Sequence, residues 1–192
     1  MSATLFAILA FGFLLGVKHA FDSDHISAMS TIAAKTKSLK KSALFGILWG
    51  FGHTISLFII GAFILLFKIT VPEKIALSFE FIVAIMLTVL GIDILIKINK
   101  NKIHIHKHGD KEHYHFHSHK FNEDHSHGHL QTGKSLLIGS IHGLAGSAAP
   151  SLLIISSVSS LSIGLFYILV FGIGSTLGMV FITASLSLPM IL

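Results

Sequence analysis

Two histidines and two aspartates lie within seven consecutive residues of a strongly apolar segment: His19, Asp22, Asp24 and His25. An aspartate near the middle of a membrane helix costs about 2.5 to 3.5 kcal/mol, so such a group is expected to face a cavity, a partner or an ion. Imidazole nitrogen and carboxylate oxygen together suit nickel, cobalt, zinc, manganese or iron. We interpret the four residues as candidate metal ligands; the alternative is that they lie in water at a helix end.

The spacing of these residues does not fit one straight helix. At about 100° per residue, His19, Asp22 and His25 share one helix face, whereas Asp24 points to the other side. Local unwinding would let Asp24 join the others and would free backbone groups, as in discontinuous membrane helices that bind ions. The sequence therefore predicts a broken or strongly tilted segment here.

Other polar residues in apolar segments are weaker candidates. His53 lies at the centre of its segment, where it is either a ligand or pathway group or a buried hydrogen-bonding residue. His142 and Ser147 are candidate pathway residues, although His142 could merely bond a neighbouring backbone group. Glu80 and Asp93 lie 13 residues apart near opposite ends of one segment, which suits either an ion relay or solvated helix ends.

The composition is that of a membrane protein. Of the 192 residues, 52% are hydrophobic and 12% are charged, and the mean hydropathy is +0.79. The absence of cysteine excludes disulfides and thiolate metal sites. All fourteen cations are lysine, and they flank apolar stretches, which argues against nucleic-acid binding as the reason for the +5 net charge. We expect the N-terminal segment to be a permanent helix and not a signal peptide.

Five segments are apolar enough to span a bilayer, which requires about 20 residues. They are residues 4–33, 43–67, 75–98, 135–158 and 161–188. Lysines concentrate between the first two segments and after the third, so the positive-inside rule places both loops in the cytoplasm and the N-terminus outside. The predicted fold is an all-α, polytopic transmembrane helical bundle.

A weak internal repeat relates the two halves of the chain. Residues 16–19 align with residues 139–142, and residues 51–55 align with residues 173–177, at offsets of 123 and 122 residues. Three spans per half would give a 3+3 inverted repeat, as in many transporters. The repeat predicts a sixth span that is missing here, through truncation or because a partner supplies it. The expected units are residues 1–98 (first repeat), 99–134 (loop) and 135–192 (second repeat).

Four short motifs resemble the nickel/cobalt transporter (NiCoT) superfamily. Residues 19–25 match its H-x4-D-H signature, and residues 52–54 (Gly-His-Thr) resemble its Gly-His-Ser motif. Residues 90–93 (Leu-Gly-Ile-Asp) resemble the start of its third motif, without the threonine-rich continuation. The short chain and residues 141–148 look most like the UreH-like branch, small membrane proteins often associated with urease maturation.

The resemblance implies metal permeation. It points to His19, Asp24, His25 and His53 as ligands or pathway groups, and Asp22 matches the acidic position between the two histidines. The metal would be transported Ni²⁺ or Co²⁺, with no resident cofactor. The implied partners are the lipid bilayer, the ion and, further, a second copy of the chain or a metallochaperone.

The loop between the third and fourth segments is rich in histidine. Ten of the fourteen histidines lie between residues 104 and 129. Histidines alternate with other residues on both sides of Gly109-Asp110, which predicts a β-hairpin over residues 103–119. His106 would then oppose His113, and His104 would oppose His115, so that each pair could chelate one metal. The alternative is an unfolded, metal-buffering tether.

Together these features predict a permease for nickel or cobalt, working in the direction of uptake. Efflux, a membrane metal sensor or chaperone built around the loop, and an intramembrane metalloenzyme are the alternatives. The sequence holds no ATP-binding or catalytic motif, so we expect no enzymatic activity. Export of sulfur oxyanions is disfavoured because the carboxylates would repel an anion.

Overall fold

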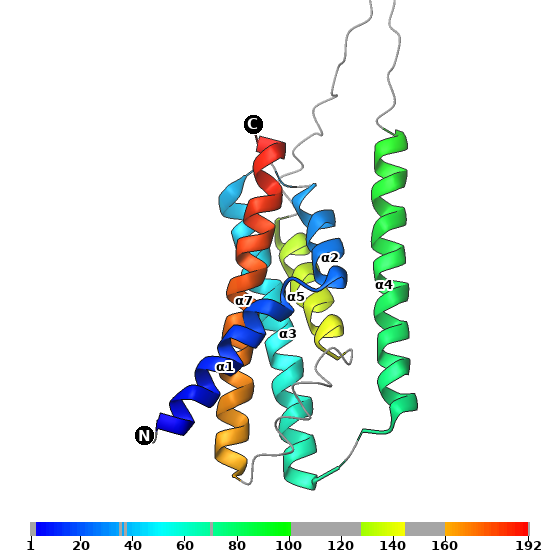
Figure 1. Cartoon of the computed structure of the whole chain (residues 1–192). Coiled ribbons are helices and arrows are strands. Elements are labelled where there is room, and N and C mark those ends of the chain that lie inside the picture. The colour runs from blue at the N-terminus through cyan, green and yellow to red at the C-terminus, as the bar shows by residue number, and fades with distance from the viewer. Residues whose placement is uncertain are drawn as a thin grey trace, which may run out of the picture.

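The structure, a computed structural model, describes residues 3–34, 36, 38–69, 71–100, 128–144 and 160–191, and every secondary-structure element among them is an α-helix (Figure 1). The helices are α1 (Ala3–His19), α2 (Ser23–Ala33), α3 (Leu39–Phe67), α4 (Glu73–Lys100), α5 (Gly128–Leu144) and α7 (Leu161–Ile191). The predicted all-α helical bundle is confirmed. The predicted hairpin over residues 103–119 lies outside the described residues.

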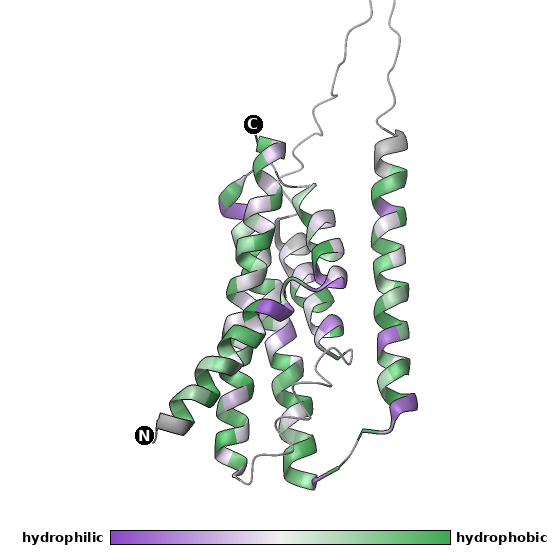
Figure 2. Cartoon of the chain, viewed as in Figure 1, coloured by the Kyte–Doolittle hydropathy of each residue, from purple (hydrophilic) through white to green (hydrophobic). Residues whose placement is uncertain are grey.

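Several helices are long and apolar enough to cross a membrane. Helices α3, α4 and α7 meet this criterion alone, and α1 and α2 meet it together as one span bent by 57°. Hydrophobic residues cover the outer surfaces of these helices (Figure 2), where large exposed side chains include Phe6, Phe63, Phe81, Leu95 and Phe181. Apolar side chains can face outward on every helix because lipid surrounds them. Of the predicted fourth span, residues 135–144 lie in α5 and the remainder lies outside the described residues.

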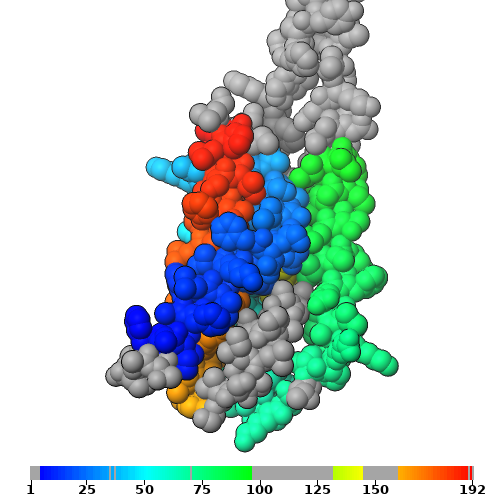
Figure 3. Space-filling model, viewed as in Figure 1, coloured from blue at the N-terminus to red at the C-terminus, as the bar shows by residue number. Residues whose placement is uncertain are grey.

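The bundle centre is built from helices of both halves of the chain. Helix α3 packs against α5 and α7, and α1 packs against α7, while α4 lies to one side with few contacts (Figure 1). In the space-filling view the blue α1–α2 segment lies over the front of the molecule, between α7 and α4 (Figure 3). The break between α1 and α2 therefore lies on this face of the molecule.

Glycines let these helices approach until their backbones touch. A Cβ atom on Gly16 would collide with the backbone of Phe171, and one on Gly139 would collide with the backbone of Trp49. These two contacts correspond to each other under the offsets of 123 and 122 residues found in the sequence. Small residues at helix crossings are the usual means of close packing in membranes, where lipid offers no hydrophobic force between helices.

The contact between α3 and α7 has the same paired character. Gly50 packs against Thr176, and Gly172 packs against Thr54, again 122 residues apart. The hydroxyl oxygens of Thr54 and Thr176 lie 3.3 Å from each other, and the Thr54 hydroxyl also lies 3.1 Å from the carbonyl oxygen of Gly172. The inverted repeat stays a prediction, and these paired contacts are what two halves related by a two-fold axis would make.

Alanine at Gly139 should destabilise the bundle, because its Cβ would meet the Trp49 backbone, which cannot move without shifting α3. Overpacking of this kind costs about 1 to 3 kcal/mol. Alanine at Gly133 on the same helix is the matched control, since nothing lies within 4 Å of its Cβ position, and it should be neutral or gain up to about 1 kcal/mol of helix propensity. Thermal unfolding in detergent measures the difference, and equal midpoints for the two variants would contradict the packing.

Candidate metal centre

The polypeptide between α1 and α2 leaves the helical path for three residues. The amide N–H of Phe21 donates to the carbonyl of Lys18, and that of Asp22 donates to His19, so α1 ends in tight three-residue turns. Asp22 is extended, with φ −62° and ψ 147°, and α2 starts at the next residue in a new direction. The prediction of a broken segment is confirmed by the 57° bend. Because of this break, Asp24 and His25 at the start of α2 are turned relative to His19 at the end of α1, away from the directions that they would have on one straight helix.

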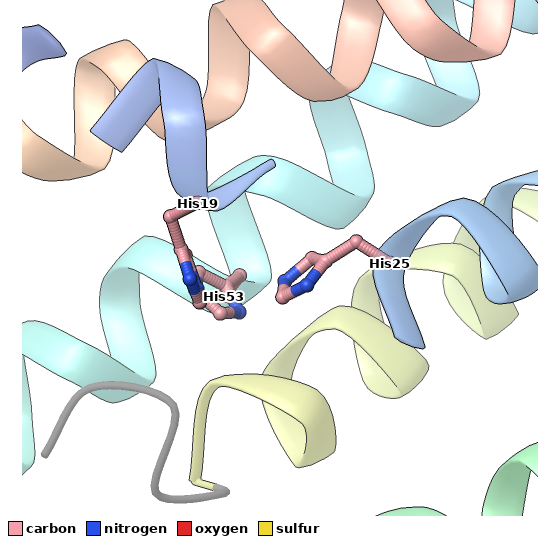
Figure 4. A group of neighbouring side chains, drawn as sticks. All are labelled: His19, His25 and His53. Atoms are coloured by element: carbon pink, nitrogen blue, oxygen red, sulfur yellow. The ribbon is translucent and has the colours of Figure 1, made fainter. Parts of the chain in front are cut away.

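Three histidines from three helices meet at the break. His19 at the end of α1, His25 in the first turn of α2 and His53 in the middle of α3 are all buried. Their ring centroids lie 4.5 Å (His19 and His25), 5.2 Å (His25 and His53) and 5.3 Å (His19 and His53) apart. One ring nitrogen of each lies within 4.8 Å of the others. Figure 4 shows the three rings directed toward one another, and we refer to them as the histidine triad.

Two of these rings are held by carboxylates. Nδ1 of His19 lies 2.8 Å from Asp22, and Nδ1 of His25 lies 3.1 Å from Asp24. In each pair the imidazole N–H donates to the carboxylate, which leaves Nε2 as the acceptor nitrogen. This is the carboxylate–histidine arrangement that orients metal-binding imidazoles.

The remaining nitrogens of the triad are unusual for a protein interior. Within the part of the chain that the structure describes, Nε2 of His19, Nε2 of His25 and both ring nitrogens of His53 are buried without a hydrogen-bond partner. Leaving one such group unsatisfied costs about 1 to 3 kcal/mol, and most buried polar groups are paired. A cation that accepts one lone pair from each ring would give a partner to three of these four nitrogens. Three nitrogens bound to one ion at about 2 Å lie at most about 3.5 Å from one another, and the nitrogens that the three rings offer lie within 4.8 Å of one another.

His142 on α5 joins the site through Asp24. Its Nε2–H donates to Asp24 Oδ2 at 2.7 Å, and its ring centroid lies 4.1 Å from that of His25. Asp24 therefore bonds two imidazoles, one on α2 and one on α5. Asp24, His25 and His142 also offer three donor atoms within 4.8 Å of one another, and we refer to them as the Asp24 group.

Two aromatic residues that the sequence analysis did not single out border the site. Phe171 on α7 lies 5.4 Å from His19 between ring centroids, and Trp49 on α3 lies 5.8 Å from His142. The two pairs correspond under the repeat offsets, which is the signal that could have found them. Sequence patterns of single helices could not, because each pair joins residues more than 90 positions apart.

The other predicted residues lie elsewhere. Asp22 touches the triad only through His19, and its side chain is 47% exposed. Glu80 is exposed on α4, and Asp93 lies on the same helix; neither belongs to the two groups that could hold a metal among the described residues. Ser147 and the loop histidines His104, His106, His113 and His115 lie outside the described residues.

Comparisons with known proteins agree with this geometry. The family model described as "NicO: High-affinity nickel-transport protein" matches residues 4–192. The chain belongs to this family. It is also 42% identical over 185 residues to the urease accessory protein UreH of Bacillus sp. (strain TB-90). The aligned region covers 96% of this chain and 78% of that protein. No solved structure matches the chain.

Membership in the NicO family confirms the resemblance that the short motifs indicated. The chain is a multi-pass membrane protein of a nickel-transport family, and the family is one of transporters and not of enzymes. The alternative of an intramembrane metalloenzyme is therefore not supported.

Replacing His53 with leucine should stabilise the metal-free protein while removing transport. No described partner of His53 loses a hydrogen bond, and two unsatisfied nitrogens leave the interior. Leucine at His142 is the matched control, because it deprives Asp24 of a bond and should destabilise the fold by about 1 to 3 kcal/mol. The midpoints of thermal unfolding in chelator-treated detergent solution distinguish His53→Leu from His142→Leu. A midpoint for His53→Leu as low as that for His142→Leu would contradict the assignment.

Proposed function

We propose that this protein is a permease that carries Ni²⁺ across the bilayer and binds it with the histidine triad. The observation that carries the proposal is that three buried imidazoles from three helices, those of His19, His25 and His53, have unpartnered nitrogens and each offer one ring nitrogen within 4.8 Å of the others. Neutral imidazole suits nickel and cobalt. Burying a histidine side chain at membrane depth costs free energy, and histidines in such positions mark ion sites or ion pathways.

In this proposal the two aspartates act through the histidines. Asp22 and Asp24 accept the Nδ1–H bonds of His19 and His25, so that each ring presents Nε2 to the ion. Their two negative charges balance the charge of a divalent cation that only neutral nitrogens contact. This refines the expectation from the sequence, in which both aspartates were candidate ligands themselves.

The ion would cross between two halves of opposite orientation. We assign residues 1–98 and 135–192 to these halves, with the N-terminus outside and residues 99–134 as a cytoplasmic loop. The paired glycine contacts at the offsets of 123 and 122 residues support this division. Rocking of one half against the other about the contact of Thr54 with Thr176 would expose the site to each side in turn.

Uptake is the direction that we propose. A cytoplasmic tract of ten histidines would bind ions as they arrive, with the pairs His104–His115 and His106–His113 as chelators if the hairpin forms. A relative that is 42% identical is named as a urease accessory protein, and a metallochaperone for a nickel enzyme would take the ion from the loop. Efflux is the rival, because the same loop could also load an exporter.

Nickel accumulation in cells tests the proposal. Cells that express the protein should contain more nickel than cells with an empty vector, and His25→Ala should lower the excess at least tenfold because the triad loses a ligand. Ser187→Ala is the control and should keep the excess, because Ser187 is buried and, among the described residues, its hydroxyl donates to the carbonyl of Ala184 on the same helix. Less nickel than in vector cells indicates efflux, and an excess unaffected by His25→Ala refutes the site. Parallel assays with cobalt, zinc and manganese show which ion the cells accumulate most.

Replacing the ten histidines between residues 104 and 129 with serine distinguishes a permease from a sensor or donor. The triad lies in the helices, so most of the nickel uptake should remain. Uptake is measured at low and high external nickel with protein levels matched. A complete loss would indicate that the loop, and not the triad, carries the function.

A further inference from the structure

We propose that Asp24, His25 and His142 form a second nickel position beside the triad, and that the ion moves between the two by changing the nitrogen of His25 that it binds. The proposal rests on the proposed nickel transport. It goes beyond that function because it assigns His142 as a ligand. His142 lies on α5, a helix that contributes no residue to the triad.

His25 belongs to both groups. Its Nε2 has no partner in the described part of the chain, and we assign this nitrogen to the triad with His19 and His53. Its Nδ1 lies 3.1 Å from Asp24 Oδ1, and the other oxygen of that carboxylate lies 2.7 Å from Nε2 of His142. One imidazole thus separates two sets of donor atoms.

The Asp24 group has the chemistry of a metal site. A carboxylate and two imidazoles bind divalent transition metals well, and the side chain of His142 is fully buried, with Nδ1 unpartnered among the described residues. In the structure two hydrogen bonds hold the group closed. A cation placed between Asp24, His25 and His142 would replace both bonds.

The protein neither gains nor loses a proton when the ion moves from the triad to the Asp24 group. When the ion leaves Nε2 of His25 for Nδ1, the proton on Nδ1 moves to Nε2. His142 likewise shifts its proton from Nε2 to Nδ1. A neutral imidazole has one lone pair for a metal, so His25 serves one position at a time and the protein holds one ion at the site.

The two positions lie on a path between the halves of the chain. Helices α1, α2 and α3 of the first half supply the triad, whereas α5 of the second half supplies His142. An ion that moves from the triad to the Asp24 group therefore passes from ligands of one half to a position that both halves share. The competing interpretation is that His142 only orients Asp24.

His142→Gln separates these two roles. The glutamine amide can donate a hydrogen bond to Asp24, as Nε2–H of His142 does, but it binds nickel poorly compared with imidazole. If His142 is a ligand, nickel transport by His142→Gln falls at least tenfold although the protein folds. Transport equal to that of the wild type overturns the proposal. His142→Asn, with a shorter amide, and Ser187→Ala show whether a loss comes from misfolding.

Nickel binding to the purified full-length chain tests the second position directly. The ten loop histidines are replaced with serine so that they do not bind the added metal, and equilibrium dialysis measures affinity and stoichiometry. We expect one ion in this background and one ion, bound at least tenfold more weakly, after His53→Ala disables the triad. His53→Ala combined with His142→Gln should bind none. Equal binding by the single and double variants overturns the second position, whereas no binding before any of these changes means that the proposed function itself fails.

Discussion

The site depends on the hydrogen bonds that the carboxylate of Asp24 accepts. It bonds one imidazole on α2 and another on α5, and the amide of His25 donates to it as well. Each unpaired buried polar group costs about 1 to 3 kcal/mol, so four buried imidazoles in an apolar bundle require such a partner. The contact of Asp24 with His25 is local to α2, whereas its contact with His142 depends on the direction that α2 takes after the break and on the position of α5.

Close backbone contacts bring the rings into reach. Gly16 and Gly139 each lie three residues before a histidine of the site, His19 and His142, and so on the same helix face. Each glycine lets a neighbouring helix touch the backbone one turn away from the ring. The helices could not carry larger residues there and still place imidazoles from four segments around one point. Small residues thus set the geometry of the site although they bind nothing.

Much of this arrangement follows from the sequence, because it depends on local patterns. Apolar length predicts the spans, and the position of Asp24 off the face of His19 and His25 predicts the break. The bond from Asp24 to His142 spans 118 residues and could not be predicted, since periodicity gives the face of a helix and not the helix that it meets. The sequence predicts Asp22 as a ligand, and its bond to the His19 ring could not be predicted for a different reason. A carboxylate beside a histidine has the same spacing whether it binds an ion or holds the ring.

A transport site must bind its ion well enough to capture it and weakly enough to release it. A single site that offered all its ligands at once would hold nickel tightly, and release would require breaking several metal–nitrogen bonds together. Two adjacent sets of donors that share His25 allow the ligands to be exchanged one or two at a time. The ion then always keeps protein ligands while it moves, and the barrier is that of a partial exchange. In the proposed exchange Asp24 changes role, because it orients a ring for the first position and contacts the ion in the second.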